Sequence, residues 1–170
     1  MTVRDRARGI DPRAITARRM PESISTFHTF DRNAYDPSLV RAALLDLTAT
    51  PGRRIRGRDQ IARTISLTVR LSDDSTVERT RALAQPSAHT DDPPVTVFRI
   101  LDSLALQRAR IRRLVTTAEI LRPAEEGPGT QISLDTARES RLCLEPVLDR
   151  INARYGRRLA GPAGAYRHAS

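Results

Sequence analysis

Two adjacent segments of alternating polar and apolar residues constrain the fold of this chain more than any other feature. Over residues 64–71, every second side chain is Ile, Leu or Val, and those between are Thr, Ser and Arg. A period of two places the two kinds of side chain on opposite faces of a β-strand. A second strand-like segment, residues 76–83, follows the polar loop 72–75, which is typical of a hairpin connection. The chain is therefore predicted to contain a strand pair with one water-facing surface.

The water-facing surface of this strand pair carries hydroxyl and guanidinium groups. Phosphate contacts need cations and hydrogen-bond donors but no base-reading groups, so this chemistry suits phosphate oxygens. Arg79 and Arg81 share the parity of Val77 and Leu83, so placing them on this surface requires a bulge or an edge position. A solvated sheet without a ligand is the alternative that the pattern alone leaves open.

The charge of the chain favours a polyanionic partner. The formal net charge is +9, the sequence pI is near 11.2, and all 29 basic residues are arginine. Guanidinium groups bind phosphate through paired hydrogen bonds. An arginine bias is also typical of a GC-rich genome, and a basic surface without a specific partner is the bland alternative. The residues expected to contact phosphate are Ser66, Thr68, Arg70, Arg79, Thr80, Arg81 and Arg112.

The other elements are indicated by capping residues and by helical spacing. Asp36-Pro37 is an N-cap followed by proline at the first helical position. Pro51-Gly52 interrupts the helix that follows, so a kink or an early stop is expected there. Further elements are expected as a strand over 23–30, a helix from Asp91-Asp92-Pro93-Pro94, a strand over 111–117 and a helix around 145–155.

This order of elements predicts an α+β fold. The sequence strand–helix–strand–strand–helix–strand gives a four-stranded sheet with two helices on one face, and a C-terminal helix follows. The second face of the sheet is expected to be open. A chain of 170 residues is long enough for one core.

Several function classes are disfavoured by what the sequence contains. Cys143 is the single cysteine, which fits a reducing cytoplasm, and its apolar neighbours predict a small core residue. No apolar run approaches the length of a membrane span, so no membrane role is expected. His89-Thr90-Asp91-Asp92 is better explained by helix capping than by a metal site. Neither a metal nor a cofactor is predicted, and no carboxylate pair suits two-metal nucleotidyl transfer.

The ordered motifs of the chain resemble one family. The run Glu22-Ser23-Ile24-Ser25-Thr26-Phe27-His28-Thr29-Phe30-Asp31 is similar to the opening strand of the little-finger domain of Y-family translesion DNA polymerases, the DNA polymerase IV group. Four further segments follow the family's order: Arg6-Ala7-Arg8-Gly9-Ile10-Asp11-Pro12 (thumb-to-finger junction), the strand pair with Glu78-Arg79-Thr80, Gln131-Ile132-Ser133-Leu134 (clamp-binding peptide) and Leu148-Asp149-Arg150-Ile151-Asn152-Ala153-Arg154-Tyr155-Gly156 (C-terminal helix).

The resemblance implies a DNA-holding module and a division of the chain. Residues 1–21 would be a thumb remnant and linker, 22–121 the little-finger DNA-binding domain, and 122–170 a linker, a clamp-motif-like segment and a helix. The open sheet face would bind duplex DNA, including damaged primer-template DNA, by its backbone during translesion synthesis and DNA repair. Phe27 and Glu22 depart from the family's polar or basic residues.

The resemblance also implies a second partner. Gln131, Ile132 and Leu134 would contact the sliding clamp, with Gln hydrogen-bonded at a pocket rim and apolar side chains inside. Asp135 stands where the family usually has Phe, and a charge fills an apolar pocket poorly. Clamp binding is therefore expected to be weak.

Two other interpretations stay open. The chain starts within what would be the thumb, so the palm is absent and the domain alone is expected not to be an enzyme. It would alternatively be the C-terminal part of a DNA-directed DNA polymerase whose catalytic part is encoded separately or lost, with a palm-containing chain as partner. An unrelated ferredoxin-like RNA binder is disfavoured, because the strands lack paired aromatic residues.

Overall fold

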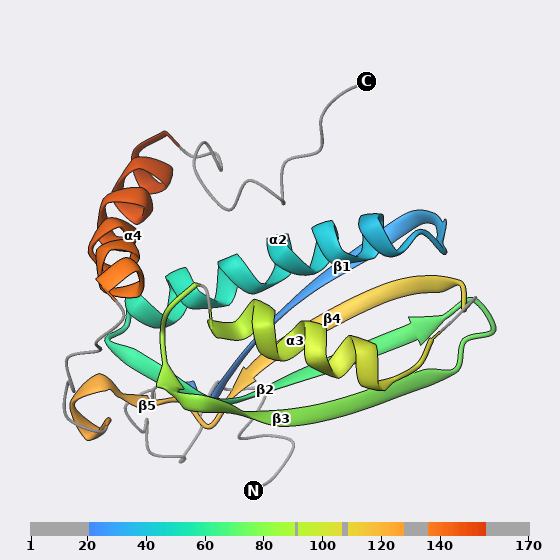
Figure 1. Cartoon of the computed structure of the whole chain (residues 1–170), viewed down its shortest axis with the longest axis horizontal. Coiled ribbons are helices and arrows are strands. Elements are labelled where there is room, and N and C mark those ends of the chain that lie inside the picture. Colours follow the sequence, from blue (N-terminus) through green and yellow to red (C-terminus); the bar gives the residue numbers. More distant parts are fainter. Residues whose placement is uncertain (1–20, 91, 107–108, 128–135, 156–170) are drawn as a thin grey trace, which may run out of the picture.

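Four long antiparallel strands form the centre of the computed structural model, which describes residues 21–90, 92–106, 109–127 and 136–155 (Figure 1). The elements in chain order are β1 (Ser23–Ala34), α2 (Pro37–Arg56), β2 (Gln60–Leu71), β3 (Thr76–Ser87), α3 (Asp92–Ser103), β4 (Ile111–Glu119), β5 (Arg122–Pro123), a 3-10 turn (Ala124–Glu126) and α4 (Thr136–Tyr155). The long strands lie in the order β1-β4-β2-β3, and the short β5 pairs with β2. The predicted α+β fold is confirmed.

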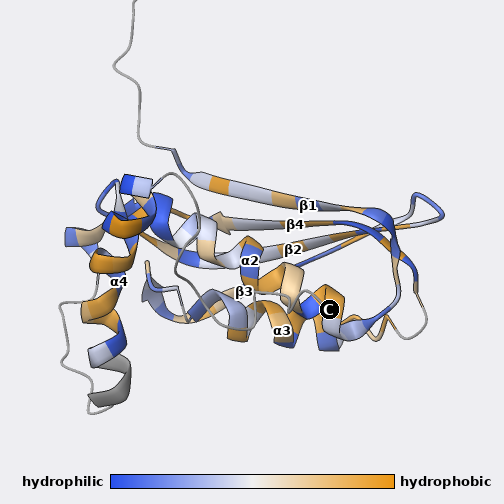
Figure 2. Ribbon diagram, turned by 90° about the horizontal axis from the view of Figure 1, so that it is seen from above, coloured by the Kyte–Doolittle hydropathy of each residue, from blue (hydrophilic) through white to orange (hydrophobic). Residues whose placement is uncertain are grey.

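Helices α2 and α3 cover the same face of the sheet (Figure 2). Helix α2 packs on β1 and β4, and α3 packs on β2 and β3. The alternation in β2 predicted that one face of this strand is buried. The prediction is confirmed, because Ile65, Leu67 and Val69 are buried against the helical layer. Among the described residues, no helix lies over the opposite face of the sheet, which we call the open face.

The predicted hairpin joins β2 to β3. Its loop closes through a hydrogen bond from the Leu71 amide to the Ser75 carbonyl, 2.9 Å long. The Asp73 carboxylate accepts the Ser75 amide at 3.0 Å, an arrangement that aspartate favours in turns. Asp74 has a φ of 65°, in the left-handed region that tight turns use. The loop chemistry therefore fixes the register of the two strands.

Helix α2 does not stop at Pro51, so of the kink or early stop predicted there the early stop is wrong. Proline has no amide hydrogen, so the carbonyl of Leu47 loses its usual helical partner. The hydroxyl of Thr26, on β1, donates to that carbonyl at 2.9 Å and replaces the missing bond. The helix then continues to Arg56, where Gly57 follows as the C-cap.

Helix α4 begins at Thr136, well before the predicted start near residue 145, and stands beside the sheet rather than over it (Figure 1). Its side toward the domain is polar, because Glu145 and Asn152 are buried. Cys143 is exposed, so the predicted core role is wrong: α4 lies outside the two-layer core. The apolar residues of α4 that are exposed are Leu144, Val147, Ile151 and Tyr155.

No helix in the described ranges has the length and apolar character that crossing a membrane would require.

Candidate nucleic-acid interface

The open face carries a regular array of side chains. Directly opposite residues of antiparallel strands point to the same side, so the continuous register defines rows across all four strands. From β1 through β4 and β2 to β3, the four rows are Ser23, Glu119, Thr64 and Ala82; Ser25, Thr117, Ser66 and Thr80; Phe27, Val115, Thr68 and Glu78; and Thr29, Arg113, Arg70 and Thr76. Nine of these sixteen residues are Ser or Thr, so the array offers mainly hydroxyl groups.

The structure distinguishes between the predicted hydroxyl contacts. Ser66 is 1% exposed and its hydroxyl donates to Glu119 at 2.9 Å, so this group is not presented to solvent. Thr68 is half-buried, and Thr80, on the edge strand, is exposed. Both lie on the open face, where a ligand would reach Thr80 first.

Two of the predicted arginines meet at one end of the open face. Arg70 and Arg112 each bind the same oxygen of Asp74, at 3.0 Å. Arg112 is the extra residue of a bulge, because the β2–β4 register shifts by one residue beside it. All three side chains are about half exposed, and ion pairs of this kind contribute only about 0–1 kcal/mol. An anionic ligand therefore has little to displace.

The other two predicted arginines lie on the opposite side of the sheet. Arg79 and Arg81 are directly opposite Leu67 and Ile65, whose side chains are buried under the helices. The register is continuous here, so no bulge turns these arginines toward the open face. Both are exposed, because β3 is the edge strand of the sheet. Their parity required either a bulge or an edge position, and the structure has the edge position. A ligand that contacts them and the open face together has to pass around this edge.

Arg113 lies on the open face, although the sequence pattern had indicated its neighbour Arg112. It lies in the same row as Arg70, and its guanidinium stacks over the ring of Phe27, 4.1 Å from the centroid. The sequence held a signal for Arg113. It precedes the apolar Leu114, which is buried, and residues next to a buried strand position point away from the core. Phe27 is 63% exposed.

The charge of the open face changes along its length. Arg70 and Arg113 lie in the row next to the hairpin loop, whereas Glu119 lies in the row at the other end. Glu22 joins Glu119 in lining a depression of about 540 Å³ there. Phosphate groups are therefore expected to approach from the arginine end.

Arg56 belongs to a contact that lies apart from the open face. The four arginines within residues 53–58 lie at the end of α2 and in the turn after it. Arg56 binds both carboxylate oxygens of Asp149 on α4, at 2.8 and 3.0 Å, and lies 3.0 Å from Glu145. It also donates to the carbonyl of Ala88 at 2.7 Å. This arginine holds α4 against the domain and is not available to a ligand.

Glu145 is the acidic centre of this contact. It accepts the Thr90 amide at 2.6 Å and faces His89 at 3.4 Å. Burial alone would raise its pKa, but the hydrogen bonds from His89 and Thr90 and the charge of Arg56 outweigh burial and lower the pKa. The carboxylate is therefore ionised when α4 is docked, and His89 and Thr90 serve this contact.

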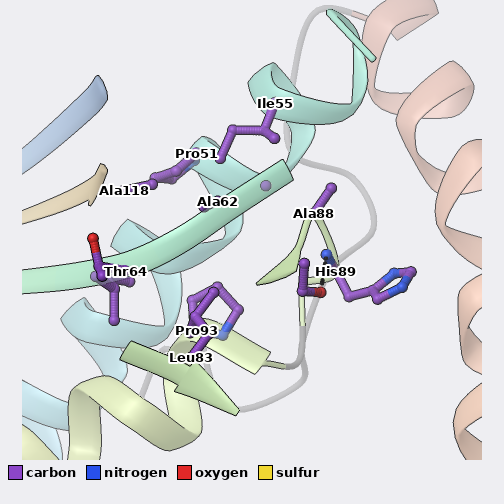
Figure 3. A pocket seen from close by; sticks show the side chains of 12 residues that line it. Pro51, Ile55, Ala62, Thr64, Leu83, Ala88, His89, Pro93 and Ala118 are labelled. Atoms are coloured by element: carbon purple, nitrogen blue, oxygen red, sulfur yellow. Dashed lines mark hydrogen bonds between the residues drawn. The ribbon is translucent and has the colours of Figure 1, made fainter. Parts of the chain in front are cut away.

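The cavity beside this contact is too small for a substrate. It lies between the end of α2, β2 and the β3–α3 connection (Figure 3). Its volume is about 10 Å³, which is room for about one water molecule. Pro51, Leu83 and Pro93 line it, and His89 points from its rim toward α4. Within the described ranges, no three His, Cys, Asp or Glu side chains group as metal ligands would.

The predicted clamp-binding residues are not placed by this structure. Gln131, Ile132 and Leu134 lie outside the described residues, as do residues 1–20 of the predicted thumb remnant and linker, 1–21. Their assignment stays a prediction.

Comparison with known sequences identifies relatives over most of the chain. The family model of the impB/mucB/samB family C-terminal domain matches residues 21–134. DNA polymerase IV of Desulfatibacillum aliphaticivorans is 29% identical over 161 residues, which are 92% of this chain and 40% of that protein. DNA polymerase IV of Dehalococcoides mccartyi strain CBDB1 is 27% identical over 152 residues, 88% of this chain and 38% of that protein. This chain thus spans about two fifths of the length of these relatives.

Solved structures share the fold. The little finger domain of PolIV, solved in complex with the beta-clamp processivity factor, matches 66% of this chain and 98% of that chain, with a TM-score of 0.50 and 15% identity. The insertion ternary complex of Dbh DNA polymerase matches 58% of this chain and 28% of that chain, with a TM-score of 0.52 and 13% identity. At these identities the likeness concerns the arrangement of helices and strands.

Proposed function

This chain belongs to the impB/mucB/samB C-terminal domain family, the little finger domain of Y-family DNA polymerases, and from that membership we propose that it binds duplex DNA through the phosphate backbone. The binding is independent of sequence and tolerates damaged bases, because the contacts are made to phosphates. In the cell the domain serves translesion synthesis and DNA repair. Nucleotidyl transfer is not part of the proposal, since the matched domain is not the catalytic palm.

The observation that carries this proposal is the composition of the open face. A solvated face of an antiparallel sheet is normally polar, and here hydroxyls dominate while arginines gather at one end. Hydroxyls and guanidinium groups are the side chains that most often contact phosphate and sugar. No described helix lies over this face, so these side chains are not carried on an element of the kind that enters the major groove to read bases.

The proposed contacts follow from exposure and position. Arg70, Thr68 and Thr80 contact the backbone from the open face, and Arg112 contacts it from the bulge. Arg79 and Arg81, which are exposed on the far side of the edge strand, contribute when the duplex passes around β3. The Ser66 hydroxyl instead orients Glu119.

Two protein partners complete the proposal. Gln131, Ile132 and Leu134 make a weak contact with a sliding clamp, as their resemblance to the clamp-binding peptide implies. A palm-containing polymerase chain supplies catalysis, by analogy with the longer relatives, of which this chain spans about two fifths.

The decisive experiment is fluorescence anisotropy with a labelled blunt duplex, titrated at several salt concentrations. Contact with about four phosphates predicts a log–log salt slope of about −3.6. Arg70→Gln and Arg112→Gln should each weaken binding and flatten the slope by about 0.9, the amount expected for one phosphate. Arg99→Gln is the matched control, because Arg99 is an exposed arginine on α3, on the covered side of the sheet.

The outcomes separate the parts of the proposal. A folded wild-type protein that does not bind duplex at low salt would refute it. Equal losses in Arg70→Gln and Arg99→Gln would show a diffuse charge effect and would remove the open face from the interface. Losses in Arg79→Gln and Arg81→Gln beyond the control would place the duplex around the β3 edge.

A further inference from the structure

Phe27 is the one phenylalanine that the core does not use. The chain has three phenylalanines, and Phe30 is 9% exposed while Phe98 packs against the core. Phe27 is 63% exposed in the middle of β1, on the open face and among hydroxyl side chains. An aromatic ring contributes most to stability when it is buried, so its exposed position gains little for the fold.

The ring of Phe27 is held in place by a cation. Arg113 reaches it diagonally from β4, with its guanidinium carbon 4.1 Å from the ring centroid. The Nε atom of Arg113 is enclosed and has no hydrogen-bond partner within the described part of the chain. The guanidinium plane of Arg113 therefore packs against the ring of Phe27, and no ion pair of Arg113 is found among the described residues. A ring oriented in advance loses less conformational freedom when a ligand stacks on it.

The surroundings of the ring match the chemistry of one nucleotide. Val115, directly opposite Phe27, extends the apolar surface by one strand. The next row along the strands holds Arg113 and Arg70, so cations for a phosphate lie beside an aromatic surface for a base. Aromatic side chains next to cations on an open sheet are how proteins hold single-stranded nucleic acid, because every base has a face that can stack. In a duplex the bases are already stacked on one another, and such a ring has no base to receive.

We propose that Phe27, held by Arg113, forms a stacking site for an unpaired base of single-stranded DNA. The proposal rests on the DNA-binding function of the open face and adds a preference to it: the chain binds a duplex with a single-stranded overhang more tightly than a blunt duplex. The unpaired base stacks on the exposed face of the Phe27 ring, and the adjoining phosphate contacts the row of Arg113 and Arg70.

The absence of tryptophan from the sequence gives a direct test. In Phe27→Trp, the single indole replaces the stacking ring, and its fluorescence should be quenched by oligo(dT) and by an overhang duplex, but not by a blunt duplex at equal occupancy. Val95→Trp is the control, because Val95 is 52% exposed on α3, on the covered side of the sheet, and its indole should not respond.

Affinity provides the second measurement. Phe27→Leu keeps an apolar side chain but has no ring, and it should bind oligo(dT) and the overhang duplex about 5- to 10-fold more weakly, which is the lower end of the loss expected when one base stack is removed. Its affinity for the blunt duplex and its salt slope should equal those of the wild type, and circular dichroism should show an unchanged fold.

The outcomes distinguish this inference from the function on which it rests. Blunt-duplex binding with the expected salt slope, together with no quenching and no loss in Phe27→Leu, would overturn the stacking site and leave backbone binding intact. Quenching by the blunt duplex equal to that by oligo(dT) would also overturn it. Failure of wild-type protein to bind any of these DNAs would refute both proposals.

Discussion

Replacing Arg56 with glutamine should release α4 while leaving the sheet and its two helices folded. Arg56 is the common partner of Glu145 and Asp149, and the side chains of these three residues are only 17%, 9% and 24% exposed. Removing one partner of a buried ion pair costs about 3–5 kcal/mol, because the remaining charge stays buried without compensation. The partial exposure of this contact favours the lower end, about 3 kcal/mol.

The loss should be local, because the buried residues that form the hydrophobic core in the described part of the chain come from residues 24–121 and not from α4. A loss of about 3 kcal/mol corresponds to about a 100-fold larger opening constant. Native-state hydrogen exchange should therefore show α4 amides exchanging about 100-fold faster, with the amides of β4 unchanged. Arg54→Gln is the matched control, since Arg54 is exposed on the same helical turn and carries the same charge.

Two results would refute this reasoning. Equal exchange of α4 in the wild type and in Arg56→Gln would show that other contacts hold the helix. Equal acceleration in the Arg54→Gln control would show that the net charge, and not the buried contact, determines docking.

Three further predictions follow from single contacts. Asp74→Asn removes the carboxylate that binds Arg70 and Arg112. Because exposed ion pairs contribute about 0–1 kcal/mol each, duplex binding measured by anisotropy at low salt should tighten about 2- to 10-fold. Weaker binding would contradict the proposed interface. Thr26→Val removes the hydroxyl that compensates for Pro51 and should lower the free energy of unfolding by about 1–2 kcal/mol in urea titration, an effect absent if water replaces the hydroxyl. The pKa of Glu145 is lowered in the folded chain, so its contribution to α4 docking is complete above its ordinary value of 4.5 and is lost as the pH falls through the lowered pKa. Protection of the α4 amides, taken relative to the intrinsic exchange rate at each pH, should therefore fall in acid before protection of β4 does; simultaneous loss of both would contradict this.

Local pattern identified most of the fold. The period of two in β2, the polar loop before β3 and the Asp36-Pro37 cap each act over a few residues, and each predicted its element. The family resemblance of the ordered motifs is likewise confirmed by the match over residues 21–134. Such signals are readable because strand alternation and helix capping depend on neighbours along the chain.

The errors concern residues whose surroundings come from distant parts of the chain. Pro51 is compatible with a continuous helix because Thr26, on another strand, supplies the missing donor. Cys143 has apolar neighbours in sequence, yet α4 docks through its polar side and leaves the cysteine exposed. Arg56 is one of several clustered arginines, and only the position of Glu145 shows that it is occupied.

The sequence by itself determined the order of the elements, the open face and its hydroxyl-rich, basic chemistry, because these follow from residue type and from spacing along one strand. The parity of Arg79 and Arg81 with Val77 and Leu83 also placed these arginines on the helical side, and the local hairpin keeps them there. Only the tertiary structure decided that Arg113 lies beside Phe27 and in one row with Arg70. The register of β4 against β1 and β2 is set by hydrogen bonds between strands that are far apart in the chain, and a shift of one residue would reverse every side chain.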